Sequence, residues 1–235
     1  MSKKIIIAID GPAGSGKSTA AKNLARKLNF TYLDTGAMYR AITYCALQRG
    51  IADDYDAVVE MTRNLDLKLR FENGVTRVFV NGEEITDKIR TAEVNSKVSE
   101  ISAIPGVREE MVKLQRAIGK DCNLIAEGRD IATVVFPDAD VKIYLTASLD
   151  ERARRRFKEY QEGSVNISFD DVKANLAKRD EIDSGRDVAP LKKAEDALEI
   201  DNTGLTPDDD LELLIKKIEA ALEKKGIQLK SLSPS

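Results

Sequence analysis

A glycine-rich octapeptide near the amino terminus carries the clearest chemical signal in the sequence. It fits the pattern G-x-x-x-x-G-K-S, which cradles nucleotide phosphates when it joins a strand to a helix. Glycines let the backbone curl so that its N–H groups point at phosphate oxygens, and the following helix adds the positive end of its dipole. Lys17 is predicted to reach the β and γ phosphates, and the Ser18 hydroxyl is predicted to bind Mg²⁺. The predicted nucleotide-binding residues are Gly11, Pro12, Ala13, Gly14, Ser15, Gly16, Lys17, Ser18 and Thr19.

The residues around this loop supply the strand and the helix that the motif requires. Residues 5–9 form a continuous apolar run, typical of a strand buried on both faces of a parallel sheet. Residues 17–28 carry apolar side chains at helical spacing, and a second strand is predicted at 30–33. Further apolar runs lie at 124–126, 141–145 and 197–200. Because longer helical patterns separate these runs, the sequence predicts an α/β fold with a five-stranded parallel sheet.

The middle of the chain follows a different pattern. Residues 65–86 alternate short strands with tight turns at 72–74 and 81–82, which predicts an antiparallel meander inserted into the α/β core. Helical patterns follow at 92–103 and 107–120. We expect the whole chain of 235 residues to form a single domain with this insertion.

Two helix starts in the second half of the chain are marked by capping signals. Ser148 and Glu151 have capping-box spacing, and Thr206 with Asp209 marks another helix entry. The terminal residues 225–235 are short and polar, so we expect them to form a frayed tail.

Composition excludes several function classes. The chain has no histidine, which removes every Ser-His or Cys-His nucleophile and the commonest general base. Its net charge of −3 comes from 37 basic and 40 acidic residues spread along the sequence, so neither nucleic acid nor a membrane surface is an expected partner. Its two cysteines are far apart, which favours a reducing, cytoplasmic setting over disulfides or zinc. The first apolar run is too short for a signal peptide or a membrane span. A monomer is the default expectation.

The phosphate loop alone leaves several classes open: a motor, a GTPase, a transporter ATPase or a small-molecule kinase. The sequence contains no Asn-Lys-x-Asp guanine-reading motif, which favours the kinase. Within kinases the acceptor could be uridylate, shikimate or a sugar acid. A nucleotide-dependent regulatory switch is an alternative from a different class, although such a switch does not need a second phosphate pocket.

Several further segments resemble one enzyme family. They are residues 34–40 (DTGAMYR), 107–116 (VREEMVKLQR), 127–139 (EGRDIATVVFPDA) and the RD...R...VAPL stretch at 179–191. Together with the phosphate loop, they resemble the bacterial cytidylate kinases of the nucleoside monophosphate kinase family over nearly the whole chain. Adenylate kinases of the same superfamily typically show a DGFPR segment, which is missing here.

This resemblance implies a fold, substrates and boundaries. The fold is the three-layer P-loop NTPase architecture with an α+β monophosphate-binding insertion and a helical lid. The core is expected at about 1–34 and 120–235, the insertion at about 35–119 and the lid at about 152–169. ATP with Mg²⁺ is the implied phosphoryl donor, and CMP and dCMP are the implied acceptors.

The resemblance also implies an acceptor site rich in arginine. A phosphate monoester is mostly dianionic at neutral pH, so its attack needs positioning and cationic charge rather than a base. Arg40 and Arg129 are implied to hold the monophosphate, and Ser99, Arg108 and Asp130 the cytosine edge. The remaining implied residues are Asp34, Thr35 and Tyr39 at the pocket entrance, and Arg179, Asp183 and Arg186 near the ribose and phosphate.

Plain structural interpretations compete with these roles. Arg179 and Asp183 are four residues apart on a predicted helix and could form a surface ion pair. Tyr39 could be a core or rim aromatic residue, and Glu127 and Asp130 could be solvated loop charges.

An arginine stripe follows the helix start at Ser148. Arg152, Arg155 and Arg156 share one helical face, so we expect this segment to close over ATP and supply a charge-stabilising arginine. A solvated helix face is the alternative. Closure would exclude water, so ATP hydrolysis without acceptor should be slow. The residues predicted to act in catalysis are Lys17, Arg129, Arg152 and Arg156.

Overall fold

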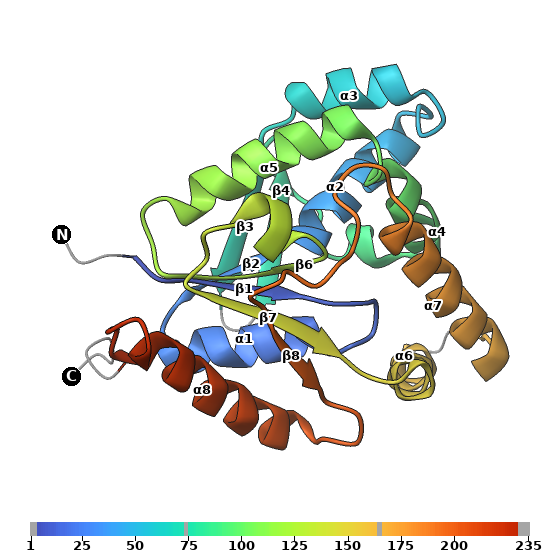
Figure 1. Ribbon diagram of the computed structural model, residues 1–235. Helices are drawn as coiled ribbons and strands as arrows, with labels where there is room; N and C mark the ends of the chain where they lie inside the picture. Colours follow the sequence, from blue (N-terminus) through green and yellow to red (C-terminus); the bar gives the residue numbers. More distant parts are fainter. Residues whose placement is uncertain (1–3, 73–74, 164–165, 230–235) are drawn as a thin grey trace.

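The computed structural model describes residues 4–72, 75–163 and 166–229 and has a central sheet of five parallel strands (Figure 1). The strand order is β2-β6-β1-β7-β8. The strands are β1 (Ile6–Asp10), β2 (Thr31–Asp34), β6 (Leu124–Gly128), β7 (Val141–Thr146) and β8 (Leu198–Asp201). The predicted five-stranded parallel sheet is confirmed, with strand ends shifted by one or two residues.

Helices cover both faces of this sheet, which confirms the three-layer architecture (Figure 1). On one face, α1 (Lys17–Leu28) and α8 (Pro207–Glu223) bury Leu24, Leu214 and Ile218 against β1 and β7. On the other face, α2 (Thr35–Gln48) and α5 (Pro105–Gly119) pack over the sheet. The central strand β1 is almost wholly apolar because it is buried between these two layers.

The segment between α2 and α5 holds a second, antiparallel sheet. Its strands are β3 (Leu67–Glu72), β4 (Val75–Val80) and β5 (Glu83–Glu84), in the order β3-β4-β5. The meander predicted at 65–86 is therefore present, and Asn81 and Gly82 both adopt the positive φ of a tight hairpin turn. The other predicted turn includes residues 73–74, which lie outside the described residues. Around this sheet lie α3 (Tyr55–Arg63), the 3₁₀ helix η1 (Lys88–Arg90) and α4 (Ala92–Ile101).

Two further helices pack side by side at one end of the molecule (Figure 1). They are α6 (Leu149–Glu162) and α7 (Phe169–Ser184), and Phe157 and Phe169 meet edge to face at 5.9 Å between ring centroids. Ser148 caps α6 by accepting a hydrogen bond from the backbone N–H of Glu151. The expected lid region 152–169 falls on these elements, although residues 164–165 lie outside the described residues.

Two smaller features complete the fold. A π-helix, η2 (Ile131–Val135), follows β6, and at the predicted helix entry Thr206 and Asp209 form a reciprocal capping box at the start of α8. Of the predicted tail, residues 230–235 lie outside the described residues, as do residues 1–3. Within the described residues, every helix is too short or too polar to cross a membrane.

Candidate active site

The predicted site residues gather at the carboxyl edge of the parallel sheet. The phosphate loop leaves β1 at this edge, Asp34 ends β2, and Glu127 lies in register with Asp34 on the neighbouring strand β6. Ligands of open α/β sheets bind at this edge, because the loops that follow parallel strands converge there. The topology therefore brings together residues that are about a hundred positions apart in the sequence.

The backbone of the phosphate loop needs glycine at its tightest points. A Cβ atom on Gly11 would lie 2.0 Å from the carbonyl oxygen of Leu145, which no side chain can tolerate. Gly16 has a φ of +88°, in the left-handed region, immediately before the first residue of α1. The loop is therefore held against β7 and opens directly into the amino terminus of a helix, where backbone N–H groups are available to an anion.

Lys17 is buried within this loop. Its Nζ donates hydrogen bonds to the carbonyl oxygen of Pro12 at 2.7 Å and to Ser15 Oγ at 3.2 Å. Burial and the nearby Arg129 lower the pKa of Lys17, while Glu127 and other acidic neighbours act in the opposite direction. A polyanion in the loop would oppose both lowering effects and favour the charged ammonium group. The geometry suits a lysine that gains its full charge when phosphate binds.

Ser18 is linked to a buried carboxylate. Its hydroxyl donates to Glu127 Oε1 at 2.6 Å, and the Tyr32 hydroxyl donates to the same oxygen at 3.2 Å. The backbone carbonyl of Glu127 accepts a hydrogen bond from Thr35 Oγ1 at 2.7 Å. Glu127 and Asp130 are each 4% exposed, so the alternative that they are solvated loop charges is wrong.

A hydroxyl and a carboxylate are oxygen ligands of the kind that Mg²⁺ prefers. The described residues contain no cluster of three acidic, histidine or cysteine side chains able to hold a metal ion without help. Mg²⁺ usually takes one or two protein ligands and completes its shell with phosphate oxygens and water, so the Ser18 and Glu127 pair fits it. The sequence patterns gave Glu127 and Tyr32 no such role. The signal that could have found them is their place on two adjacent strands beside the phosphate loop.

Four arginines from separate elements converge beside the loop. The pKa of Arg179 is lowered to about 10, first by burial and then by Arg129, with smaller contributions from Arg156 and Arg40, while Asp183 opposes the shift. The Nε atom of Arg179 is buried and makes no hydrogen bond within the described part of the chain. Because like charges repel, an anion bound among the guanidinium groups would offset this repulsion.

Acidic side chains hold part of this arginine cluster in place. Arg40 pairs with Asp34 at 3.3 Å, and Arg129 pairs with Asp183 at 2.8 Å. Asp183 also pairs with Arg186 and is 2% exposed, so it is not the solvent-facing partner of Arg179 that helical spacing alone would allow. These carboxylates orient the arginines without neutralising all of them.

A second group of predicted residues lies next to this cluster. Arg108 forms a buried ion pair with Asp130, and its Nη1 donates to the carbonyl oxygen of Ser102 at 3.0 Å. The Arg108 guanidinium lies 5.4 Å from the centroid of the Tyr39 ring, which is buried. Ser102 links the remaining members, since its Oγ accepts from Arg186 at 2.9 Å and donates to the carbonyl oxygen of Ser99 at 3.1 Å.

Asp10 helps to position this second group. Its two carboxylate oxygens accept hydrogen bonds from the backbone N–H groups of Ile131 at 2.8 Å and Ala132 at 2.7 Å. Burial nevertheless raises the pKa of Asp10 to about 7. Asp10 therefore fixes the start of η2 immediately after Asp130, a role that sequence analysis did not identify.

The three arginines of the stripe on α6 make different contacts. Arg152 is buried and donates to the carbonyl oxygens of Ala147 at 3.0 Å and Ala13 at 3.1 Å. Arg155 and the buried Asn202 both donate to the carbonyl oxygen of Ser15. Arg156 pairs with Glu159 at 3.0 Å and is the stripe residue whose charge acts on Arg179. Arg152 and Arg155 therefore brace the phosphate loop in this conformation, and Asn202, which follows β8, is a bracing residue that sequence analysis missed.

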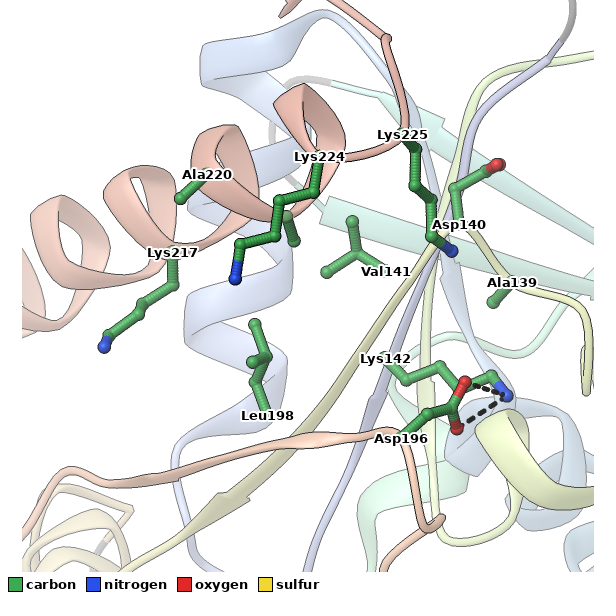
Figure 2. A pocket seen from close by; sticks show the side chains of 11 residues that line it. Ala139, Asp140, Val141, Lys142, Asp196, Leu198, Lys217, Ala220, Lys224 and Lys225 are labelled. Carbon is green, nitrogen blue, oxygen red and sulfur yellow. Dashed lines mark hydrogen bonds and ion pairs between the residues drawn. The ribbon is translucent and has the colours of Figure 1, made fainter.

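A cavity of about 370 Å³ lies at the opposite edge of the sheet (Figure 2). It is formed where β7 and β8 begin and where α8 ends, and lysines surround it, of which Lys142 pairs with Asp196 at 2.9 Å. This cavity shares no residue with the phosphate loop or the arginine cluster, so it is separate from the candidate active site.

Comparisons with known proteins agree with this geometry. Residues 7–220 match the family model described as cytidylate kinase. A cytidylate kinase of Streptococcus agalactiae serotype III (strain NEM316) is 50% identical over 224 residues, which cover 94% of this chain and 99% of that protein. A cytidylate kinase of Enterococcus faecalis (strain ATCC 700802 / V583) is 48% identical, covering 96% and 99%.

A solved structure supports the fold alone. The crystal structure of an uncharacterized protein from Eubacterium ventriosum aligns with a TM-score of 0.53 at 14% identity, covering 93% of this chain and 99% of that one. The family match and the high identity over almost the full length carry the stronger conclusion: the chain belongs to the cytidylate kinase family.

Proposed function

We propose that this protein transfers the γ-phosphoryl group of ATP to the phosphate of CMP and dCMP, giving ADP with CDP or dCDP. The observation that carries the proposal is the convergence of Arg40, Arg129, Arg156 and Arg179 beside the phosphate loop. One polyanion fits the loop, and a second anion fits the arginines next to it. A kinase for a phosphate-bearing acceptor needs these two sites side by side.

The acceptor site has the chemistry of a cytidine monophosphate. The guanidinium groups suit a dianionic phosphate, and the Arg108–Asp130 pair next to them offers both donors and an acceptor to a base edge. Cytosine has an exocyclic amine that donates and a carbonyl that accepts. Ser99, Asp34 and Thr35 complete the proposed acceptor pocket, and Arg186 and Asp183 lie towards the ribose.

The transfer requires no general base, because the attacking phosphate is already mostly dianionic at neutral pH. Lys17 and the loop N–H groups bind the β and γ phosphates of ATP, and Arg129 lies between the two nucleotide sites. Bound Mg²⁺, which Ser18 and Glu127 would hold, neutralises charge on the transferring phosphoryl group. Arg152 and Arg156 are proposed to assist when α6 and α7 close as a lid over residues 152–169.

We also propose a division of labour along the chain. Residues of about 1–34 and 120–235 form the nucleotide core, and residues of about 35–119 form the insertion that holds the monophosphate. Every proposed site residue comes from one chain, so a monomer in the cytoplasm, where ATP and nucleoside monophosphates are available, is sufficient for activity.

The direct test is ADP release from Mg·ATP with CMP, dCMP, UMP, AMP, GMP and shikimate in turn, and with no acceptor. The expected result is a kcat/KM for CMP and dCMP at least about a hundredfold above the other acceptors, the discrimination that matched polar base contacts can give. Release without acceptor should be slow. Faster phosphorylation of shikimate or UMP than of CMP would contradict the proposal.

A further inference from the structure

Gln115 is a buried amide whose hydrogen-bonding atoms are unused. It lies on α5 and is 1% exposed, and neither its Oε1 nor its Nε2 makes a hydrogen bond with any described residue. Buried polar side chains nearly always have partners, because an unpaired one costs free energy in the folded state. A glutamine kept in this position despite that cost calls for a functional explanation.

The Tyr39 hydroxyl is a second buried polar group of this kind. Tyr39 lies on α2, is 7% exposed, and its hydroxyl also lacks a hydrogen-bond partner among the residues that the structure describes. Burial raises the pKa of Tyr39 to about 12, and the side chains of Arg108, Arg186 and Gln115 act in the opposite direction. The amide of Gln115 therefore lies close to the Tyr39 hydroxyl, and the Tyr39 ring centroid lies 5.4 Å from the Arg108 guanidinium.

The helix α5 ties Gln115 to the residues that would read the base. Arg108 lies seven residues earlier, which is two helical turns, so both side chains project from the same face. The next residue, Arg116, donates to the carbonyl oxygens of Val134 at 2.7 Å and Val135 at 2.9 Å in η2, the π-helix that begins directly after Asp130. Gln115 is therefore fixed relative to the Arg108–Asp130 pair.

We propose that Gln115 is a positioning and specificity-determining residue of the acceptor site. When CMP fills the pocket, the amide hydrogen-bonds the Tyr39 hydroxyl, and through Tyr39 it holds the Arg108 guanidinium against the cytosine. Gln115 acts through Tyr39 and does not touch the reacting phosphates. An amide suits this role because it donates and accepts without adding a charge beside the Arg108–Asp130 pair. The inference rests on the proposed function, since it assumes that the pocket binds a nucleoside monophosphate.

Two nearly isosteric variants and their combination test the role. Gln115→Met replaces the amide by an apolar chain of similar length, and Tyr39→Phe removes the hydroxyl. Each should raise the KM for CMP about tenfold, the order expected for one hydrogen bond, with kcat and the KM for ATP changed less than about twofold. The double variant should be no worse than either single variant, because both remove the same interaction.

Stability distinguishes positioning from packing. In the free protein each variant removes a buried polar group that makes no hydrogen bond with the described residues, so the denaturation midpoint should stay the same or rise while the KM for CMP rises. The exposed neighbour Lys113 provides the matched control Lys113→Met, which should change neither quantity. An unchanged KM for CMP, a rise in KM matched by a fall in the midpoint, or additive effects in the double variant would each overturn the proposal.

The same variants separate this inference from the proposed function. They are assayed with whichever monophosphate the unaltered protein phosphorylates fastest. If that acceptor is not CMP, the proposed function fails. The role of Gln115 stands if the KM for the preferred acceptor still rises in Gln115→Met, and it fails if that KM is unchanged.

Discussion

Arg179 is the side chain whose surroundings make least sense without a ligand. It is half-buried with a buried Nε atom, it lies among other guanidinium groups, and its pKa is lowered to about 10 as a result. Removing its charge should therefore relieve repulsion in the free protein and weaken binding of the acceptor phosphate. Arg179→Met should lower the affinity for CMP about 10- to 100-fold, from the roughly 1.5–3 kcal/mol of a hydrogen bond to a charged group.

Calorimetry with CMP and denaturant unfolding check this prediction together. The free energy of unfolding of Arg179→Met should equal or exceed that of the unaltered protein. Lys178→Met, one residue away and exposed on the same helix, should change neither measurement. A loss of stability without a loss of CMP affinity would show that Arg179 serves packing instead.

For Asp183, unlike Arg179, the neighbouring charges together have a larger effect on the pKa than burial has. Burial opposes its ionisation, but Arg129 and Arg186 outweigh burial and lower its pKa. A carboxyl group with a lowered pKa stabilises the folded state above its ordinary pKa near 4, and this contribution is lost as the pH falls through the lowered value. Asp183→Asn leaves two half-buried arginines without their partner, so it should cost about 3 kcal/mol at neutral pH.

Urea unfolding from pH 8 to pH 3 tests the direction of this pKa shift. The difference in unfolding free energy between the unaltered protein and Asp183→Asn should be constant from pH 8 to about pH 5. It should narrow below pH 4, where the Asp183 carboxyl group takes up a proton in the unfolded chain while it is still ionised in the folded protein. A difference that grows as the pH falls would mean that the pKa of Asp183 is raised.

Glu127 is the residue on which the proposed Mg²⁺ site depends most, because it holds the Ser18 hydroxyl. Glu127→Gln should raise the Mg²⁺ concentration for half-maximal activity about 10- to 100-fold, the usual effect of losing a group that orients a metal ligand. Glu127→Asp keeps the carboxylate and should retain most of the affinity. Titration of activity with Mg²⁺ at fixed ATP measures this concentration. If Glu127→Gln needs the same Mg²⁺ concentration as the unaltered protein, Glu127 is not part of the Mg²⁺ site.

The sequence predicted candidate site residues where a motif names each position, and it predicted none where only topology places them. The glycine loop, Lys17 and Ser18 follow from a pattern whose geometry is local. The acceptor residues were predicted from the family resemblance, because their residue types and spacings alone do not indicate a binding role. Asp10, Glu127 and Asn202 act at strand ends, so their roles depend on which strands become neighbours. That order is a long-range property that local patterns do not encode.

At the scale of helices and strands, local signals were more informative. The helix predicted at 17–28 has those bounds, because the glycine loop ends where the helix begins and the apolar stripe runs along the length of the helix. The π-helix η2 was not predicted. Its extra residue per turn has no periodic signature in five residues, and it is held by Asp10 at its start and Arg116 at its end.

The capping box of α8 allows a test of stability that should not change catalytic activity. Thr206 Oγ1 accepts from the N–H of Asp209, and the Asp209 carboxylate accepts from the backbone N–H of Thr206. Thr206→Ala should lower the free energy of unfolding by about 1 kcal/mol, while Thr206→Ser should restore most of it. Denaturant unfolding measures the loss. Because α8 packs on the face of the sheet away from the acceptor segments, kcat should be unchanged, and a fall in kcat would contradict this separation.

At the scale of the whole molecule, the sheet acts as a platform that sets the two proposed anion sites side by side. The phosphate loop follows β1, and the arginines arrive from α2, the end of β6, α6 and α7, on both sides of that loop. Helices α6 and α7 carry both the braces of the loop and Arg156 and Arg179, so their movement would affect both sites together. Neither site is complete without elements that are distant in sequence.

The two proposed sites depend on one physical idea: the loop and the arginine cluster form one continuous cationic surface along which the phosphates of both nucleotides lie. A bisubstrate compound that links adenosine and cytidine through five phosphates tests it directly by calorimetry. If both sites are occupied in line, the compound should bind at least about a hundredfold more tightly than ATP or CMP alone, because the second contact becomes intramolecular. Binding no tighter than that of ATP would contradict the account.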